Sequence, residues 1–133
     1  MNMGRRAGIY SALVIFILLA TAGVSFAQKG RSVVRRVSFP RGRTTTILRG
    51  AVKRGLSHDY LLRAQAGQTM TVHLASESRA VTFTIRTPDG DYPADFARDW
   101  QGQLPVSGDY RINVLPPTET EAPASYTLEV TIR

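Results

Sequence analysis

The 133-residue sequence contains no cysteine, one tryptophan and only two histidines. The lack of cysteine excludes disulfide bonds, thiolate metal sites and a lipid anchor attached to a cysteine. The two histidines, His58 and His73, have no short-spaced partner, so the sequence does not support a histidine zinc site. A folded domain of this chain must therefore be stabilised by apolar burial and backbone hydrogen bonds.

Long apolar runs are also scarce, because only the segment from Ala12 to Ala20 forms one. Arg5 and Arg6 precede this run, and Ser25-Phe26-Ala27 follows it with small residues three and one positions before a cleavage point. This arrangement is typical of a secretory signal peptide over residues 1–27. We expect cleavage near Ala27 and a periplasmic or secreted protein beginning at Gln28.

Two alternatives remain for this segment. Residues Gly8 to Ala27 are long enough to stay as a membrane anchor, although small and polar residues dilute the end of the run. The Arg5-Arg6 pair is also compatible with twin-arginine export, but two basic residues before an apolar run are equally ordinary in general secretion.

Acidic residues are rare in the first part of the exported segment. Between Gln28 and Arg63 there are ten basic residues and one acidic residue, Asp59, whereas from Ala64 onward there are five basic and nine acidic residues. Such a basic stretch indicates an anionic envelope partner, such as lipopolysaccharide, a glycan or a wall polymer, or simply a solvated surface. The candidate polyanion-binding residues are Arg35, Arg36, Arg41, Arg43, Arg49, Lys53 and Arg54. We expect no nucleic acid partner.

Apolar and polar residues alternate with a period of two over most of the exported segment, and no convincing helical period is present. The strongest strands are predicted around Met70 to Leu74, Val81 to Ile85, Tyr110 to Val114 and Tyr126 to Ile132. Weaker ones are predicted at Val33 to Phe39, Thr46 to Val52, Asp59 to Ala64 and Trp100 to Leu104. Only Asp95 to Asp99 leaves room for a helical turn.

Glycine, proline and aspartate clusters separate these strands, as in Ser107-Gly108-Asp109 and Pro88-Asp89-Gly90. The 106 residues after Ala27 are enough for one domain. We therefore predict an all-β protein with a single antiparallel β-sandwich or jelly-roll-like domain of about eight strands at residues 37–133. Residues 28–36 are expected to form a basic N-terminal arm or an edge strand.

Two aromatic residues are expected to have structural roles. Tyr110 follows a tight turn at the start of a strand, as in the tyrosine corner of Greek-key sandwiches, in which the hydroxyl bonds to nearby backbone. Trp100 is expected to cap one end of the core, with an exposed binding role as the alternative.

Several runs resemble the bacterial periplasmic inhibitors of g-type (goose-type) lysozyme. They are Gly50-Ala51-Val52, the segment from Asp59 to Met70, the segment from Trp100 to Tyr110 and the segment from Tyr126 to Val130. The strand pattern is also similar to the wider group of pre-peptidase C-terminal β-sandwiches. The resemblance covers roughly Val37 to Ile132, and the Trp-x-Gly-x-Leu-Pro-x-Ser-Gly-Asp-Tyr run is its most specific part.

This resemblance implies an exported, non-catalytic binding protein without a cofactor, which inserts a loop into the cleft of a g-type lysozyme or another wall hydrolase. The matching positions of the inhibitory loop are Ser107, Gly108, Asp109 and Tyr110, of which Gly108 and Tyr110 also suit a turn needed for folding. One departure concerns the segment after the next strand. The inhibitors carry basic residues there, whereas Leu115 to Pro123 is proline-rich and acidic.

Catalysis and metal binding have weaker support. His58, Asp59 and Ser107 would supply the residue types of a hydrolase triad, but no motif places the serine on a nucleophile elbow. Asp89, Asp91, Asp95 and Asp99 would supply oxygens for calcium, although Pro88-Asp89-Gly90 is more simply a turn. Two hypotheses therefore remain, namely an inhibitor of a wall hydrolase and a surface-binding module for an anionic polymer.

Overall fold

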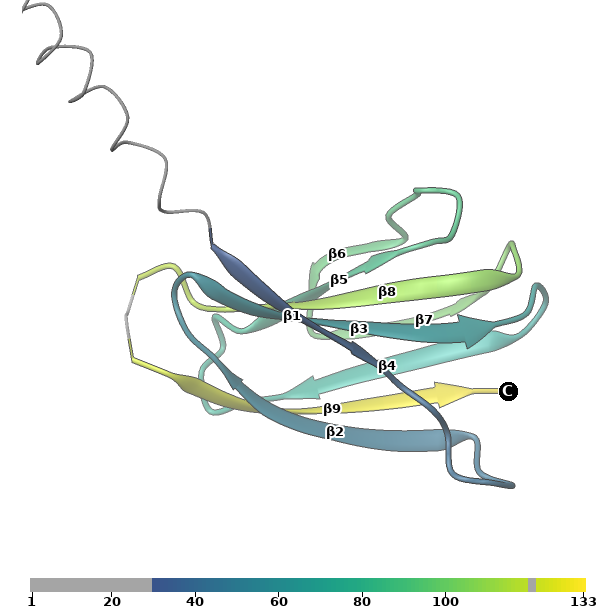
Figure 1. Ribbon diagram of the computed structural model, residues 1–133, viewed down its shortest axis with the longest axis horizontal. Helices are drawn as coiled ribbons and strands as arrows, with labels where there is room; N and C mark the ends of the chain where they lie inside the picture. The colour runs from purple at the N-terminus through teal and green to yellow at the C-terminus, as the bar shows by residue number, and fades with distance from the viewer. Residues whose placement is uncertain (1–29, 120–121) are drawn as a thin grey trace, which may run out of the picture.

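The computed structural model of the chain describes residues 30–119 and 122–133. Nine strands make up the fold (Figure 1), and the described residues contain no helix. The strands are β1 (Arg31–Arg36), β2 (Thr45–Val52), β3 (Leu56–Ala64), β4 (Thr69–Ala75), β5 (Thr82–Arg86), β6 (Ala94–Ala97), β7 (Asp99–Gln103), β8 (Gly108–Leu115) and β9 (Ala124–Ile132). The predicted signal peptide, residues 1–27, lies outside the described residues. Residues 30–119 and 122–133 include no helix that is long and apolar enough to span a membrane.

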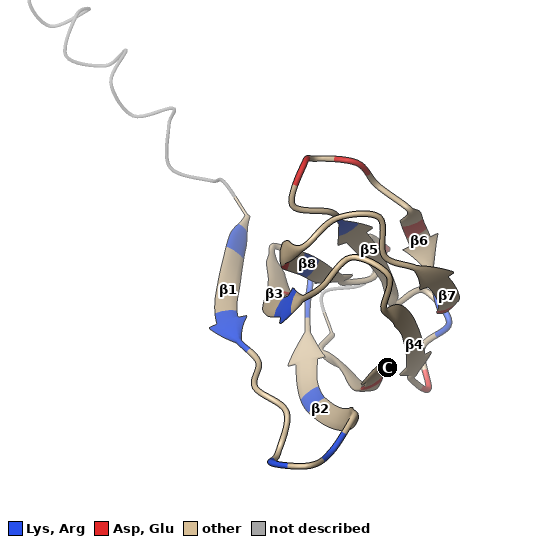
Figure 2. Cartoon of the chain, turned by 90° about the vertical axis from the view of Figure 1, so that its right-hand side faces the viewer, with Lys and Arg blue, Asp and Glu red and all other residues tan. Residues whose placement is uncertain are grey.

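The strands form two sheets that pack face to face as a β-sandwich. One sheet has the order β1-β3-β8-β5-β6 and the other has the order β2-β9-β4-β7. The predicted all-β sandwich is therefore confirmed. Its two free sides differ, because the edge strands β1 and β2 lie on one side and the edge strands β6 and β7 lie on the other (Figure 2).

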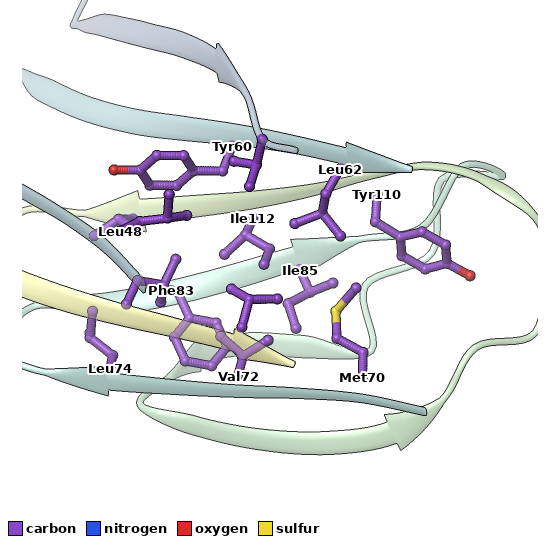
Figure 3. Close-up of a cluster of buried hydrophobic side chains, with 14 of the residues drawn as sticks. Leu48, Tyr60, Leu62, Met70, Val72, Leu74, Phe83, Ile85, Tyr110 and Ile112 are labelled. Atoms are coloured by element: carbon purple, nitrogen blue, oxygen red, sulfur yellow. The ribbon is translucent and has the colours of Figure 1, made fainter. Parts of the chain in front are cut away.

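The core follows directly from the alternation in the sequence. Met70, Val72 and Leu74 of β4 are buried, whereas His73 between them is exposed. The same alternation buries side chains from β3, β5, β8 and β9, so that apolar residues of both sheets meet in one layer (Figure 3). Because the chain has no cysteine, removal of this apolar area from water is the main favourable term in folding.

The segment that leaves room for a helical turn, Asp95 to Asp99, does not form one, because it belongs to strands β6 and β7. β6 pairs with β5 through Phe83↔Ala97 and Ile85↔Ala94, with a β-bulge between these pairs. Phe96 lies in the bulge with φ of 49° and an exposed side chain. The bulge hides the period-two pattern, since an extra residue shifts the following side chain to the other face.

β1 differs from the other strands because it pairs in parallel, with β3. Its ladder runs from Arg31↔Leu56 to Arg36↔Leu61, and all six of its residues are exposed. The observed strand thus begins and ends earlier than the segment Val33 to Phe39 that the alternation predicts. After β1, Val37 remains attached to the sheet, because its amide donates to the Leu61 carbonyl at 2.8 Å.

The tyrosine corner is confirmed. The Tyr110 side chain is completely buried, and its hydroxyl donates to the Val106 carbonyl at 2.6 Å, four residues upstream. Trp100 is partly buried and packs against the core, as expected. Its ring lies over Gly102, where a Cβ atom would come within 2.5 Å of the indole, so the small residue makes room for the tryptophan.

A polar cluster joins the two sheets near the start of β3. The Tyr126 hydroxyl is hydrogen-bonded to His58 Nδ1 at 2.6 Å and to the Tyr60 hydroxyl, and both tyrosines are buried. Gly50 permits this approach, because a Cβ atom there would lie 2.7 Å from the Tyr126 hydroxyl. Burial lowers the pKa of His58 and raises the pKa of Tyr126. Both shifts favour the neutral forms of His58 and Tyr126.

We expect Tyr110→Phe to destabilise the domain by roughly 1–3 kcal/mol, because the partly buried hydrogen bond from the hydroxyl to the Val106 carbonyl is lost. Urea unfolding followed by tryptophan fluorescence measures this change. Tyr92→Phe is the control, since Tyr92 is 59% exposed and its hydroxyl makes no hydrogen bond within the described residues. Equal stability of the two variants would show that the corner contributes nothing.

Acidification is expected to lower the free energy of unfolding through His58. The pKa of His58 is lower in the folded chain than the ordinary 6.5, so the unfolded chain binds the proton more readily. The contribution of neutral His58 to the free energy of unfolding is therefore complete above pH about 6.5. It is lost as the pH falls through the pKa that His58 has in the folded chain. His58→Gln should remove this part of the pH dependence, whereas His73→Gln should keep it. Unfolding curves between pH 8 and 5 test the difference, and an unchanged profile in His58→Gln would contradict it.

Candidate functional site

The candidate inhibitory loop lies at the end of the sandwich where β7 ends and β8 begins. Leu104 is buried and anchors the connection, while Pro105 and Ser107 are exposed. The connections β3–β4 and β5–β6 reach the same end, because β3 ends opposite the start of β8 and β5 also ends there. Residues far apart in the sequence therefore surround the loop.

Two neighbouring connections brace the loop directly. The Ser107 hydroxyl oxygen accepts a hydrogen bond from the Ala66 amide at 2.8 Å, which ties it to the β3–β4 connection. Gly108 has φ of 141°, a conformation that side chains disfavour, and a Cβ atom there would lie 3.0 Å from the ring of Pro88. A larger residue at position 108 would strain the backbone and push against the β5–β6 connection.

Asp109 points outward from β8 and is held by a residue from a distant strand. Arg36 at the end of β1 donates to both carboxylate oxygens of Asp109, at 3.0 and 2.8 Å, across the intervening strand β3. This bidentate contact lowers the pKa of Asp109 and raises that of Arg36, and Arg63 adds a smaller attraction to the carboxylate. Both side chains remain about half exposed.

Of the four predicted loop residues, only two expose their side chains. Tyr110 is buried beneath the loop and Gly108 shapes the backbone, whereas Ser107 and Asp109 are exposed. These two offer a hydroxyl and a carboxylate in a fixed geometry, because Ala66 and Arg36 hold them. The loop therefore presents hydrogen-bonding groups that need little further ordering when a partner binds.

Sequence reasoning missed the polar network on the outer face of the β1-β3-β8-β5-β6 sheet. Asp59 is only 5% exposed and accepts hydrogen bonds from Arg111 Nη1 at 3.0 Å and from the Asn113 amide. Together with the Arg36 and Asp109 pair, these contacts join β1, β3 and β8. The pairing of Asp59 with residues more than fifty positions away has no signal in the local sequence.

The candidate polyanion-binding residues all lie along one side of the sandwich, although they are not in one cluster. Arg35 and Arg36 belong to β1, Arg49 belongs to β2, and the others occupy the two connections that flank β2. All seven are exposed. Figure 2 shows basic segments on β1, on the β1–β2 connection and on β2, whereas acidic segments occupy the β5–β6 connection at the top of the view.

The structure keeps the residues of the hypothetical triad apart. His58 is near the start of β3, whereas Ser107 lies beside the end of this nine-residue strand. At about 3.3 Å per residue, the separation is roughly 20 Å, so the imidazole cannot activate this hydroxyl. His58 instead bonds to Tyr126, and the Asp59 carboxylate bonds to Arg111.

The four aspartates considered for calcium do not converge either. Asp89 accepts a hydrogen bond from Thr87, Asp95 accepts one from Thr84 at 2.8 Å, and Asp99 bonds to His73. Within residues 30–119 and 122–133, no group of three or more histidine and carboxylate side chains is arranged to hold a metal ion. The four aspartates are close in the sequence, but they do not form one calcium-binding site.

One surface hollow lies away from the candidate loop. It has a volume of about 990 Å³ and lies at the opposite end of the sandwich, beside the start of β9. Small side chains and prolines line most of it, together with Arg49, Glu77 and Tyr126. None of the predicted loop residues lines this hollow.

Comparisons with known proteins place the fold among bacterial β-sandwiches. No protein-family model matches the chain, and no curated protein matches it by sequence. Among solved structures, the periplasmic g-type lysozyme inhibitor PliG of Aeromonas hydrophila is 28% identical, with a TM-score of 0.70 over 77% of this chain and 98% of that one. PliG of Salmonella Typhimurium is 21% identical, with a TM-score of 0.64 over 76% of this chain and 98% of that one.

A third structure is more distant. The pre-peptidase C-terminal domain of a Bacillus anthracis collagenase is 10% identical, with a TM-score of 0.50 over 77% of this chain and 95% of that domain. Its likeness concerns the fold alone. Together, these structures confirm the resemblance to inhibitors of g-type lysozyme and, more broadly, to pre-peptidase C-terminal sandwiches.

Arg36→Gln is expected to raise the pKa of Asp109 toward its ordinary value, because the bidentate hydrogen bond is the main cause of the shift. Arg63→Gln is the matched control and should move the pKa of Asp109 by less, since Arg63 acts only through its charge at a distance. Carboxyl carbon chemical shifts in an NMR pH titration measure both variants. A larger effect of Arg63→Gln would contradict the assigned pairing.

Proposed function

We propose that the protein is an exported, non-catalytic inhibitor that binds a g-type lysozyme or a similar cell-wall hydrolase. The observation that carries this proposal is the exposed and braced pair Ser107 and Asp109 at one end of the sandwich. In the proposed complex, these side chains enter the cleft of the enzyme and bond to its donors. The similarity to solved inhibitors of this class supports the proposal.

The rigidity of the loop is the physical reason for assigning it a binding role. A loop that must become ordered on binding loses conformational freedom, and this loss weakens the complex. Here the Tyr110 hydroxyl, the Ala66 amide and the Arg36 guanidinium each fix one part of the loop before any partner arrives. The proposed mode of inhibition is therefore obstruction of the cleft by a preformed wedge.

The acidic, proline-rich segment after β8 lies at the other end of this strand from the candidate loop. Pro116 and Pro117 follow the end of β8, and Ser107 precedes its start, so an eight-residue strand separates them. A cleft contact centred on Ser107 and Asp109 therefore does not require the basic residues that the inhibitors carry in that segment. The proposed contact consists of the loop end alone.

The geometry does not support the hydrolase triad considered from the sequence, because His58 and Ser107 are far apart. We place the protein in the periplasm or outside the cell. This location rests on the predicted signal peptide and on the periplasmic location that is stated for the structurally similar inhibitors.

The exported chain beginning at Gln28 is expected to slow the lysis of cell walls by g-type lysozymes. Ser107→Ala combined with Asp109→Ala should weaken inhibition at least about tenfold, because it removes two central polar contacts. Glu77→Ala combined with Ser78→Ala is the matched control, since it removes the same kinds of group at the opposite end of the sandwich. Inhibition constants from turbidity assays measure all three proteins.

Two results would overturn the proposal. The first is a lack of inhibition by the wild-type chain across a panel of g-type lysozymes from animals and bacteria. The second is an equal loss of inhibition in the two double variants, because the loop would then have no special role. Circular dichroism of each variant verifies that the sandwich is intact.

A further inference from the structure

The side of the sandwich formed by β1 and β2 carries a set of exposed basic side chains, here called the basic edge. Its members come from β1, the β1–β2 connection, β2 and the β2–β3 turn: Arg31, Arg35, Arg36, Arg41, Arg43, Arg49, Lys53 and Arg54. No acidic residue occurs between Gly30 and His58. The charge asymmetry of the sequence thus becomes an asymmetry between the two sides of the fold (Figure 2).

These basic groups are largely free to bind a partner. Among the described residues, Arg36 is the only member of the basic edge that forms an ion pair. Glu129, which is opposite Ile47 in the ladder between β2 and β9, forms no ion pair with any of the eight. Seven unneutralised cations on one side produce a positive potential that attracts anions.

The basic edge also exposes apolar side chains between its charges. Val33 and Val34 of β1 are 52% and 54% exposed, and Ile47 of β2 is 54% exposed. By contrast, the exposed aromatic residues, Tyr92 and Phe96, lie near the β6 side of the molecule. Single-stranded nucleic acids bind mainly where aromatic rings accompany basic residues, so the basic edge does not fit them.

The shape of the basic edge favours an extended partner over a single small anion. Its charges extend from the β2–β3 turn at one end of the sandwich to the β1–β2 connection at the other. The eight residues of β2 alone span about 26 Å at 3.3 Å per residue. Arg41 and Arg43 project from a turn that the Arg43 amide closes by donating to the Pro40 carbonyl at 2.9 Å.

We propose that the basic edge docks on the surface of a bilayer that contains anionic phospholipids. Arginine and lysine contact the headgroup phosphates, and exposed Ile47 reaches the apolar part of the interface. Docking through this side turns the acidic β6 and β7 side away from the membrane. This proposal uses different residues from the lysozyme contact and does not rest on it.

Vesicle co-sedimentation of the exported chain tests the proposal. We expect binding to phosphatidylcholine vesicles with about 30% phosphatidylglycerol, little binding to pure phosphatidylcholine, and weaker binding as salt rises above about 0.1 M. The triple variant Arg41→Gln, Arg43→Gln, Lys53→Gln should bind at least about tenfold more weakly. The matched control, Arg79→Gln, Arg86→Gln, Arg133→Gln, removes the same charge outside the basic edge and should bind like the wild type.

A fourth variant tests the apolar contribution. Ile47→Thr keeps a β-branched residue in β2 and should reduce the binding that persists at high salt, because its contact with the interface is weaker. Equal binding by the two triple variants would overturn the proposal. Tighter binding to duplex DNA or to a soluble anionic glycan than to the anionic vesicles would also overturn it. Lysozyme inhibition by the basic-edge variant, measured in parallel, separates this surface from the candidate loop.

Discussion

Burial of apolar side chains between two sheets is the constraint on which the rest of this structure depends. The chain has no cysteine, so no covalent link replaces that burial. Residues such as Phe83, Ile112 and Leu128 come from three different strands and are completely removed from solvent. The candidate loop inherits its rigidity from this core, because buried Leu104 and Tyr110 flank it on both sides. A loop on a looser scaffold would lose more freedom on binding.

Polar contacts then select one arrangement of the strands on the outside of this core. The pair of Arg36 and Asp109 attaches β1 to β8 across β3, and buried Asp59 bonds to two side chains of β8. A half-exposed ion pair adds little stability by itself. Its value here is positional, since it fixes the carboxylate that the candidate loop presents.

The sequence predicted the features that depend on local pattern and missed those that depend on distant partners. Strands β4, β8 and β9 have a clear period of two, and the turn before Tyr110 has its own signature, so both were predictable. β6 was not, because its bulge places exposed Phe96 where the alternation fails. Neither the parallel pairing of β1 nor the contact between Arg36 and Asp109, 73 positions apart, leaves a local trace. The candidate residues were thus identified from the resemblance to a known family, whereas their contacts and exposure became clear only from the structure.

The position of β9 has a consequence for the order in which the second sheet forms. This strand is the last of the nine, yet it lies between β2 and β4, which form no ladder with each other. The second sheet therefore has no central member until β9 joins it, and the ladder between β2 and β9 closes a long loop. During folding, β2 and β4 have to stay apart until β9 takes its place between them. We therefore expect completion of this sheet to be a late step in folding.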